Sequence, residues 1–200
     1  MWGWYLKKCA ILGHCLISEN QDFCIKLGIS EVNYVPAIYY LEKSCEGGLA
    51  VSCQELGTVY ELGLGVKKDL YKVKDLYQKS CDMGESQGCF LLGLQYYNGQ
   101  GVQKDRAKGN ELFGQTCELD NPRGCFELAN SYKGGYGVKR DQAYAIELYL
   151  KVCNINYAQA CFSLDEIYKS GQGVEKTPEI SISYYQKSCS LGFEKACKKQ

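Results

Sequence analysis

The chain has 200 residues, of which 23 are lysine or arginine, 23 are aspartate or glutamate and 13 are cysteine. This charge balance excludes the basic excess by which many proteins attract nucleic acid or an anionic membrane surface, and no apolar run approaches the length of a membrane-spanning helix. So many cysteines indicate a protein of an oxidising compartment, where they form disulfide bridges.

Residues 1–18 have the outline of a signal peptide, because two lysines precede a short apolar stretch, residues 9–17. The alternative is that this segment stays in the protein and that Cys15 pairs with Cys24, which leaves Cys9 without a mate. If the segment is a signal, Cys24 is the unpaired thiol. The sequence leaves both alternatives open.

Residues 19–48 are predicted to form a shortened helix pair. The segment Cys24–Gly28 imitates the start of the unit that recurs downstream, but Cys24 and Cys45 are only 21 positions apart, where 28 would be expected. The glycine-rich turn between the two helices is missing. We therefore expect a degenerate first repeat with a short loop.

From residue 49 onward, one pattern recurs with a period of 36 residues. A fixed period of this length is the signature of a stacked-repeat protein, in which each unit is one small group of helices or strands. The four complete units are 49–84, 85–120, 121–156 and 157–192.

The first half of each unit predicts an amphipathic helix that ends in a glycine-rich turn. In the unit 49–84, Cys53, Leu56 and Tyr60 stand at i, i+3 and i+7, the apolar stripe of one helix. A Gly-x-Gly-Val turn follows, and all four units carry it. Glycine tolerates positive φ, so the first glycine suits a helix C-terminus and the second suits the loop.

A second helix is predicted just downstream of each turn. Its N-cap is an aspartate in three units and a threonine followed by Pro178 in the fourth. These caps are Asp69, Asp105, Asp141 and Thr177. The second helices also carry an aromatic residue four positions before their cysteine: Tyr77, Phe113, Tyr149 and Tyr185. We expect the helix pairs to stack into an all-α, right-handed solenoid, closed by a C-terminal cap over residues 193–200.

Ten of the cysteines form pairs with seven residues between the two members, and the pairs recur with the period of the units. The pairs are Cys45 and Cys53, Cys81 and Cys89, Cys117 and Cys125, Cys153 and Cys161, and Cys189 and Cys197. A bridge in each pair would join one unit to the next, and closing so short a loop would contribute about 2.5 kcal/mol. We therefore predict five disulfides rather than nucleophiles or metal ligands.

These motifs resemble the Sel1-like repeat family, a relative of the tetratricopeptide repeat, and within it the Helicobacter cysteine-rich proteins. The combined pattern Cys-x-x-Leu-Gly-x-x-Tyr and Gly-x-Gly-Val-x-Lys-Asp covers residues 45–197 with few departures. Ala129 and Asp165 replace the glycine after the leucine, and Thr177 replaces the aspartate. Exported relatives begin with a signal, so the resemblance slightly favours the signal-peptide alternative for the N-terminus.

Bacterial members of this group carry the label of beta-lactamases or penicillin-binding proteins, which makes an enzyme acting on beta-lactams the alternative hypothesis. A serine beta-lactamase needs a Ser-x-x-Lys motif, and the sequence has none. A zinc enzyme needs several histidines, and the chain has one, His14. The sequence therefore predicts no catalytic residue, no metal and no cofactor.

The leading hypothesis is a secreted or periplasmic monomer that binds a peptide, a protein or a cell-wall fragment on its concave face. In helical solenoids the first helix of each unit typically lines that face. Once the core stripe is removed, the predicted ligand-binding residues are Glu55, Thr58, Leu91, Leu94, Gln95, Glu127, Asn130, Ser131, Ser163, Glu166 and Ile167. These positions vary between units while the stripe does not, as expected if they meet a ligand; a merely solvated face is the alternative.

Overall fold

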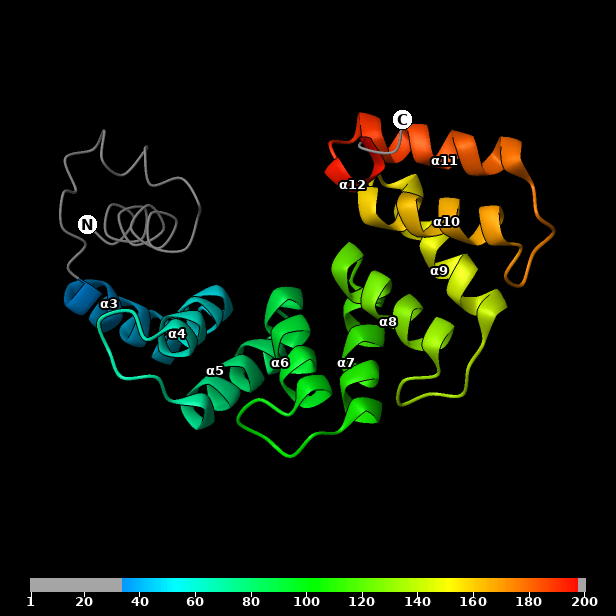
Figure 1. Ribbon diagram of the computed structural model, residues 1–200. Coiled ribbons are helices and arrows are strands. Elements are labelled where there is room, and N and C mark those ends of the chain that lie inside the picture. Colours follow the sequence, from blue (N-terminus) through cyan, green and yellow to red (C-terminus); the bar gives the residue numbers. More distant parts are fainter. Residues whose placement is uncertain (1–33, 198–200) are drawn as a thin grey trace. The chain divides into compact units, whose positions relative to one another are not determined.

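Residues 34–197 are described by the computed structural model, and all regular elements in this range are α-helices (Figure 1). They are α3 (Tyr34–Glu46), α4 (Ala50–Leu62), α5 (Leu70–Asp82), α6 (Ser86–Asn98), α7 (Arg106–Glu118), α8 (Pro122–Gly134), α9 (Gln142–Asn154), α10 (Ala158–Ser170), α11 (Pro178–Ser190) and α12 (Glu194–Cys197). The predicted all-α fold is confirmed. The predictions for the signal segment, for Cys9, Cys15 and Cys24, and for the tail after Cys197 lie outside the described residues.

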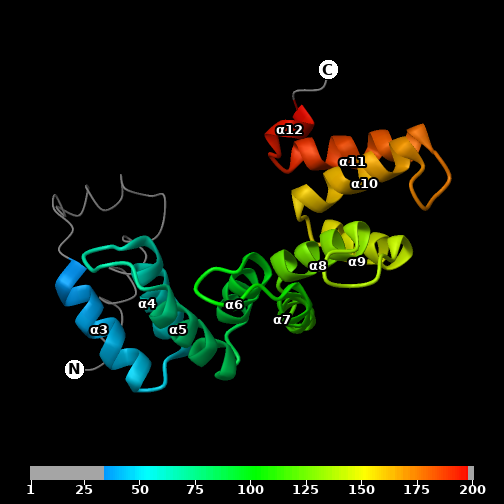
Figure 2. The same cartoon turned by 60° about the horizontal axis from the view of Figure 1, so that its bottom comes forward.

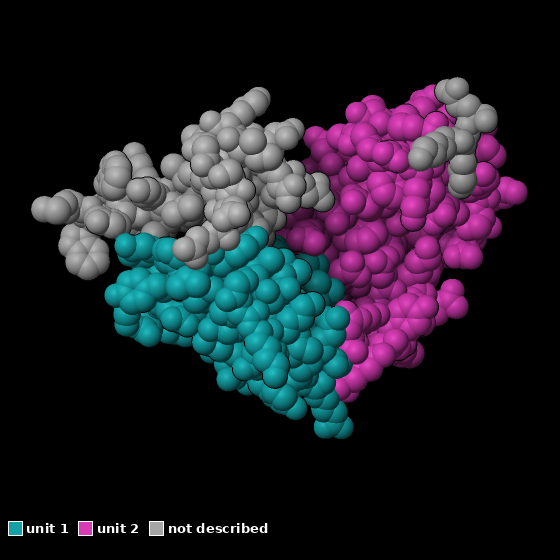
Figure 3. All heavy atoms as spheres, turned by 60° about the vertical axis from the view of Figure 1, so that its left-hand side comes forward, with its two compact units in different colours: residues 1–95, 99–103 teal, residues 96–98, 104–200 magenta. Residues whose placement is uncertain are grey.

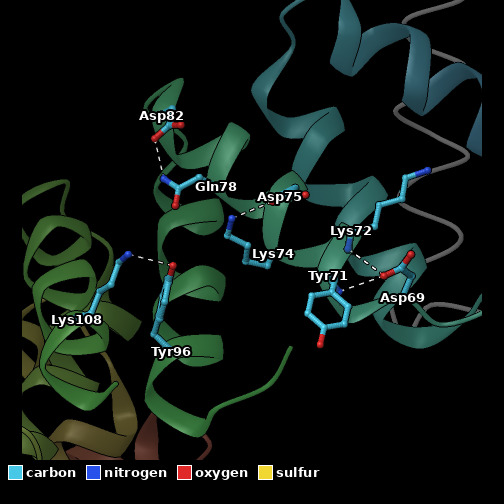
Figure 4. Close-up of polar contacts among 9 residues, drawn as sticks. All are labelled: Asp69, Tyr71, Lys72, Lys74, Asp75, Gln78, Asp82, Tyr96 and Lys108. Atoms are coloured by element: carbon cyan, nitrogen blue, oxygen red, sulfur yellow. Dashed lines mark hydrogen bonds and ion pairs between the residues drawn. The ribbon is translucent and has the colours of Figure 1, made fainter. Parts of the chain in front are cut away.

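Three of the second helices begin at the aspartates that the sequence predicts as N-caps. The Asp69 carboxylate accepts hydrogen bonds from the backbone nitrogens of Tyr71 and Lys72, at 3.1 and 3.0 Å (Figure 4). Asp105 and Asp141 cap α7 and α9 with one such bond each, from the backbone nitrogens of Lys108 and Tyr144. A carboxylate at this position satisfies backbone N–H groups that have no acceptor within the helix.

The fourth second helix, α11, differs from the prediction. Thr177 occupies the N-cap position, but its side chain makes no capping hydrogen bond. Its hydroxyl donates instead to the carbonyl oxygen of Glu175 at 3.1 Å. The helix still begins here because Pro178 has no N–H to satisfy and its fixed φ suits the first helical turn.

The first glycine of each Gly-x-Gly-Val turn ends a first helix, as predicted. Gly135, for example, has a φ of 73° and its N–H donates to the carbonyl oxygen of Ser131. This left-handed conformation is the usual C-cap of a helix and costs glycine little. The equivalent C-caps are Gly63, Gly99 and Gly171.

The second glycine of the turn makes a contact that the sequence does not reveal. Gly137 also has a φ of 73°, and a Cβ placed on it would lie 2.5 Å from the Cβ of Arg106, at the start of the preceding second helix. The equivalent contacts join Gly65 to Tyr34, Gly101 to Leu70 and Gly173 to Gln142. Each turn therefore lies directly against the preceding repeat, and Gly101 and Gly137 lie against its backbone atoms.

The chain divides into two compact units (Figure 3). The first holds the described parts of residues 1–95 and 99–103, and the second those of 96–98 and 104–200, so α6 contributes to both. In the first unit, α4 packs against α3 and α5. In the second unit, α8 packs against α7 and α9, and α10 packs against α9 and α11 (Figure 2).

The core of each unit contains the aromatic residues of the second helices. Tyr77 and Tyr149 have no exposed surface, and Phe113 is 1% exposed. The Tyr77 ring lies close to α4 because residue 57 is glycine: a Cβ there would lie 2.5 Å from the ring. In this repeat, the small residue after the leucine therefore allows the tyrosine to pack against the first helix.

All five predicted disulfides are present, and each links the end of one helix to the next helix along the chain. The Cα–Cα separations lie between 4.4 and 4.9 Å, within the usual range for disulfides. The bridges are Cys45–Cys53, Cys81–Cys89, Cys117–Cys125, Cys153–Cys161 and Cys189–Cys197. They tie each repeat to its neighbour, as the spacing predicts.

Within residues 34–197, no helix has the length and the apolar character that crossing a membrane requires. The same stretch holds no cluster of three or more His, Cys, Asp or Glu side chains that could bind a metal ion.

Candidate binding surface

Each compact unit carries a polar cluster at the same place in its repeats. The cluster consists of first-helix residues, at positions three apart on one helix face, around the hydroxyl of a second-helix tyrosine. The cluster of the first unit surrounds Tyr77 and that of the second unit surrounds Tyr149. We call them the Tyr77 cluster and the Tyr149 cluster.

The Tyr149 cluster joins three helices of the second unit. The Tyr149 hydroxyl, from α9, donates to Asn130 Oδ1 on α8 at 2.6 Å, and Asn130 Nδ2 donates to Glu127 Oε2 at 3.3 Å. Ser163 and Glu166 on α10 lie near the same phenol, since both influence its ionisation. Four residues that the sequence predicts to bind a ligand are therefore brought together around one hydroxyl.

The phenol of the Tyr149 cluster stays protonated. Burial raises the pKa of Tyr149 well above its ordinary value; the hydrogen bond with Ser163 opposes this shift, and the carboxylates of Glu127 and Glu166 add to it. The protonated phenol donates its hydrogen bond to Asn130, and the carboxyl groups of Glu127 and Glu166 lie nearby. Glu127 is half-buried and Glu166 is exposed.

The Tyr77 cluster repeats this arrangement in the first unit. The Tyr77 hydroxyl donates to Glu61 Oε2 at 2.8 Å and lies 3.2 Å from the hydroxyl oxygen of Thr58. Burial raises the pKa of Tyr77, the bond with Thr58 opposes the shift, and the carboxylates of Glu61 and Glu55 add to it. Here too a protonated phenol lies beside two carboxyl groups.

Glu55 differs from the other carboxyl groups of the clusters. Desolvation raises its pKa from 4.5 to about 7. Its Oε2 atom is buried and has no hydrogen-bond partner among the described residues. The side chain therefore exchanges between the neutral and the charged form near neutral pH, and can meet a ligand either as a donor or as an acceptor.

The unit 85–120 differs from both clusters in a consistent way. Phe113 stands where the clusters have tyrosine, and the two first-helix positions hold Leu91 and Leu94, both partly buried. Polar first-helix residues thus occur in repeats that have a phenol, and apolar ones in the repeat that has a phenyl ring. This correspondence indicates that the two polar clusters are a feature of particular repeats rather than of all.

Four of the predicted ligand-binding residues are buried: Ser163, and three residues that lie in the core. Gln95, Ser131 and Ile167 are 1%, 0% and 1% exposed. Each stands three positions after the leucine of its first helix, so it continues the apolar stripe, as Val59 does in α4. The expectation that these three residues are exposed was wrong. Gln95 and Ser131 have polar side chains, which do not indicate a core position in the sequence.

The sequence does not identify three members of the clusters: the hydroxyls of Tyr77 and Tyr149 and the carboxylate of Glu61. The sequence assigns the tyrosines to packing, and their burial confirms this role. The same rings also carry hydroxyls that reach the first helices. The contrast with Phe113 is the signal from which this second role could have been predicted.

The two clusters together contain four glutamate carboxyl groups. None of the ion pairs found within residues 34–197 includes a glutamate of either cluster. These glutamates are Glu55, Glu61, Glu127 and Glu166. An ion pair between one of these carboxyl groups and a cationic group of another molecule would therefore displace none of the ion pairs found here.

The repeats match a family model described as Sel1 repeat, over residues 24–49, 50–85, 86–121, 122–157 and 152–193. A comparison with curated proteins finds no match.

Solved structures share the fold. A Sel1 repeat protein from Oxalobacter formigenes is 26% identical with a TM-score of 0.78, and the match covers 89% of this chain and 71% of that one. The Helicobacter pylori cysteine rich protein B is 28% identical with a TM-score of 0.53, over 65% of this chain and 93% of that one. The protein c5321, a protective antigen of uropathogenic Escherichia coli with an SLR fold, is 26% identical with a TM-score of 0.78. That match covers 81% of this chain and 35% of c5321, so the chain spans about a third of that protein's length.

Proposed function

Because the chain belongs to the Sel1 repeat family, we propose that it is a disulfide-stapled scaffold whose first helices capture a basic peptide segment of a partner protein. The five disulfides point to an oxidising compartment, and a secreted or periplasmic location is part of the proposal. The bridges hold neighbouring helices in place before binding, which reduces the ordering cost of association.

The observation that supports this function best is the Tyr149 cluster. Glu127 and Glu166 come from different helices, α8 and α10, and both lie close enough to Tyr149 to raise its pKa. A lysine or arginine side chain placed between them would gain two carboxylate partners, while Asn130 holds the phenol in place. Lysine and arginine are thus the side chains that this surface fits.

The test is fluorescence anisotropy with the oxidised full chain and two labelled peptides of equal length, one rich in lysine and one with glutamate at the same positions. The basic peptide should bind and the acidic peptide should not. In the double variant Glu127→Gln with Glu166→Gln, affinity for the basic peptide should fall tenfold or more, since each lost contact is worth about 1 kcal/mol. Pull-down from secreted and cell-envelope material would then identify the natural partner.

A matched control separates a defined site from general charge attraction. Glu118 and Glu147 are exposed glutamates on the second helices α7 and α9, so their double change to glutamine removes the same charge elsewhere. This control should leave the affinity for the basic peptide within about twofold. Equal losses in the two double variants, or equal binding of the two peptides, would contradict the proposal.

A further inference from the structure

The last complete repeat has a charged residue where the other repeats have a small one. Asp165 on α10 stands at the position that is glycine in the first two complete repeats and alanine in the third: Gly57, Gly93 and Ala129. In the first of these, a Cβ would lie 2.5 Å from the Tyr77 ring, so a small residue lets the second-helix aromatic pack against the first helix. An aspartate cannot serve that purpose.

The surroundings of Asp165 have changed accordingly. Asp165 is only 4% exposed, and its carboxylate accepts a hydrogen bond from Ser181 Oγ on α11 at 2.5 Å. Tyr185, the counterpart of Tyr77 and Tyr149, is partly exposed where those two are fully buried. Its hydroxyl oxygen is nevertheless buried and has no hydrogen-bond partner among the described residues. The Tyr185 side chain is therefore less completely buried than its counterparts in the other repeats.

An open pocket lies in this repeat, between α10 and α11. Its volume is about 410 Å³, within the range of roughly 300–1,000 Å³ of pockets that hold small molecules. Its lining includes Asp165, Lys169, Lys176, Ser181, Ile182 and Tyr185. One carboxylate, two ammonium groups and an apolar wall therefore border one space.

The charges of the pocket are not neutralised by one another in ion pairs. Asp165 stands four residues before Lys169, a spacing at which the two side chains often pair on a helix. None of the ion pairs found within the described chain includes Asp165, Lys169 or Lys176. Burying a carboxylate costs free energy unless it gains partners. The third repeat has alanine at this position, so the fold does not need a carboxylate there.

We propose that this pocket binds a short peptide with a free amino terminus and a free carboxyl terminus. The ammonium group of the ligand donates to the Asp165 carboxylate, and its carboxylate accepts from the ammonium groups of Lys169 and Lys176. The Tyr185 hydroxyl gains the partner that it lacks, and an apolar side chain of the ligand covers Ile182. The site is separate from the Tyr77 and Tyr149 clusters and does not depend on the function proposed for them.

Isothermal titration of the oxidised full chain with three forms of one dipeptide tests the proposal. The probes are alanyl-phenylalanine, its N-acetylated form and its C-terminal amide. The free dipeptide should bind, and each blocked form should bind at least fivefold more weakly, because each lacks one of the two charges that the pocket recognises.

Two variants assign the recognition to the named residues. Asp165→Asn keeps the acceptor for Ser181 but removes the charge, so it should abolish the preference for the free dipeptide over its N-acetylated form. Lys169→Gln with Lys176→Gln should abolish the preference over the amide. The matched control, Lys133→Gln with Arg140→Gln at the same positions of the unit 121–156, should keep both preferences.

Circular dichroism melting of each variant confirms that the protein is folded when it is titrated. Equal affinity for the three forms, failure of the folded wild-type protein to bind the free dipeptide at millimolar concentration, or unchanged preferences in Asp165→Asn would each overturn the proposal. The variants Glu127→Gln and Glu166→Gln test the basic-peptide surface separately, so the two proposals can fail independently.

Discussion

Burial changes the acid–base chemistry of individual residues in the clusters, and Glu55 shows the consequence for stability. Its folded-state pKa of about 7 lies above its ordinary value of 4.5, because desolvation disfavours the charged form. Between these two pH values the folded protein holds a proton that the unfolded chain has released. Folding is therefore favoured by this group at low pH, and the advantage is lost as the pH rises through about 7.

We expect Glu55→Gln to remove this pH dependence. Glutamine has nearly the same shape and is never charged, so the variant should melt at a higher temperature than the wild-type protein at pH 8. At pH 4.5, where the wild-type side chain is protonated in the folded state, the two should melt within about a degree of each other. Calorimetry at both pH values measures the difference, with the exposed Glu111→Gln as the control; a pH-independent effect of Glu55→Gln would refute the burial argument.

Single-residue roles could be predicted from the sequence where a local motif determines them. Asp69 is a cap because an aspartate before a helix accepts backbone hydrogen bonds wherever it occurs. The sequence places Thr177 at a cap but cannot tell that its hydroxyl turns to Glu175. Gln95 and Ser131 were predicted to be exposed, but their polar side chains lie on the buried stripe of a helix.

At the scale of helices and turns, each Gly-x-Gly-Val segment both ends a first helix and contacts the preceding repeat. The helix C-cap follows from the local sequence, because the first glycine can adopt positive φ without the help of a distant contact. The contact of the second glycine does not, because its partner stands 31 positions earlier: Gly137 meets Arg106. A period in the sequence reveals that repeats stack, but not which backbone atoms come into contact.

The two glycines of one turn should therefore respond differently to alanine. Gly135→Ala introduces only the strain of a side chain at positive φ, about 1–2 kcal/mol, since its nearest neighbour would be the Arg140 Cβ at 3.4 Å. Gly137→Ala has the same φ and in addition brings a methyl group against the Arg106 backbone, so it should cost roughly 3 kcal/mol or more. Urea unfolding of both variants measures the free energies; equal losses would mean that the turn and the preceding repeat do not press against each other.

At the scale of the whole molecule, every joint between described repeats has its own disulfide, and the bridges differ in how accessible they are. Cys125 and Cys161 are fully buried, whereas Cys197 is exposed and Cys189 is partly exposed. In thiol–disulfide exchange, the thiolate of the reductant must reach a sulfur atom of the bridge. The exposure of a bridge therefore affects the rate at which it is reduced. The stability that the bridges add to the folded chain should accordingly be lost in steps.

We expect the bridge Cys189–Cys197 to be reduced before Cys117–Cys125 and Cys153–Cys161. Brief treatment with a low concentration of reductant, followed by alkylation and peptide mass spectrometry, reports the order. The same digestion without reductant should recover each cysteine linked to its partner eight positions away. Simultaneous labelling of all the bridges would indicate that the repeats open together rather than from the exposed joint.

The enzyme hypothesis is also tested on the whole molecule. The sequence predicts no serine, zinc or cysteine–histidine arrangement for beta-lactam hydrolysis. The purified protein should therefore hydrolyse a chromogenic beta-lactam no faster than a matched blank, and a chelator should change nothing. Saturable hydrolysis that follows the protein through several columns would revive the enzyme hypothesis.

The local pairing of the cysteines has a consequence for the evolution of repeat number. Each unit of 36 residues carries the second cysteine of one bridge near its start and the first cysteine of the next bridge near its end. If a whole unit is duplicated or deleted, the cysteines on either side of the new junction again stand eight positions apart and find a partner. A gene of this kind can therefore lengthen or shorten by entire units without producing an orphan thiol, which a protein with long-range bridges could not do.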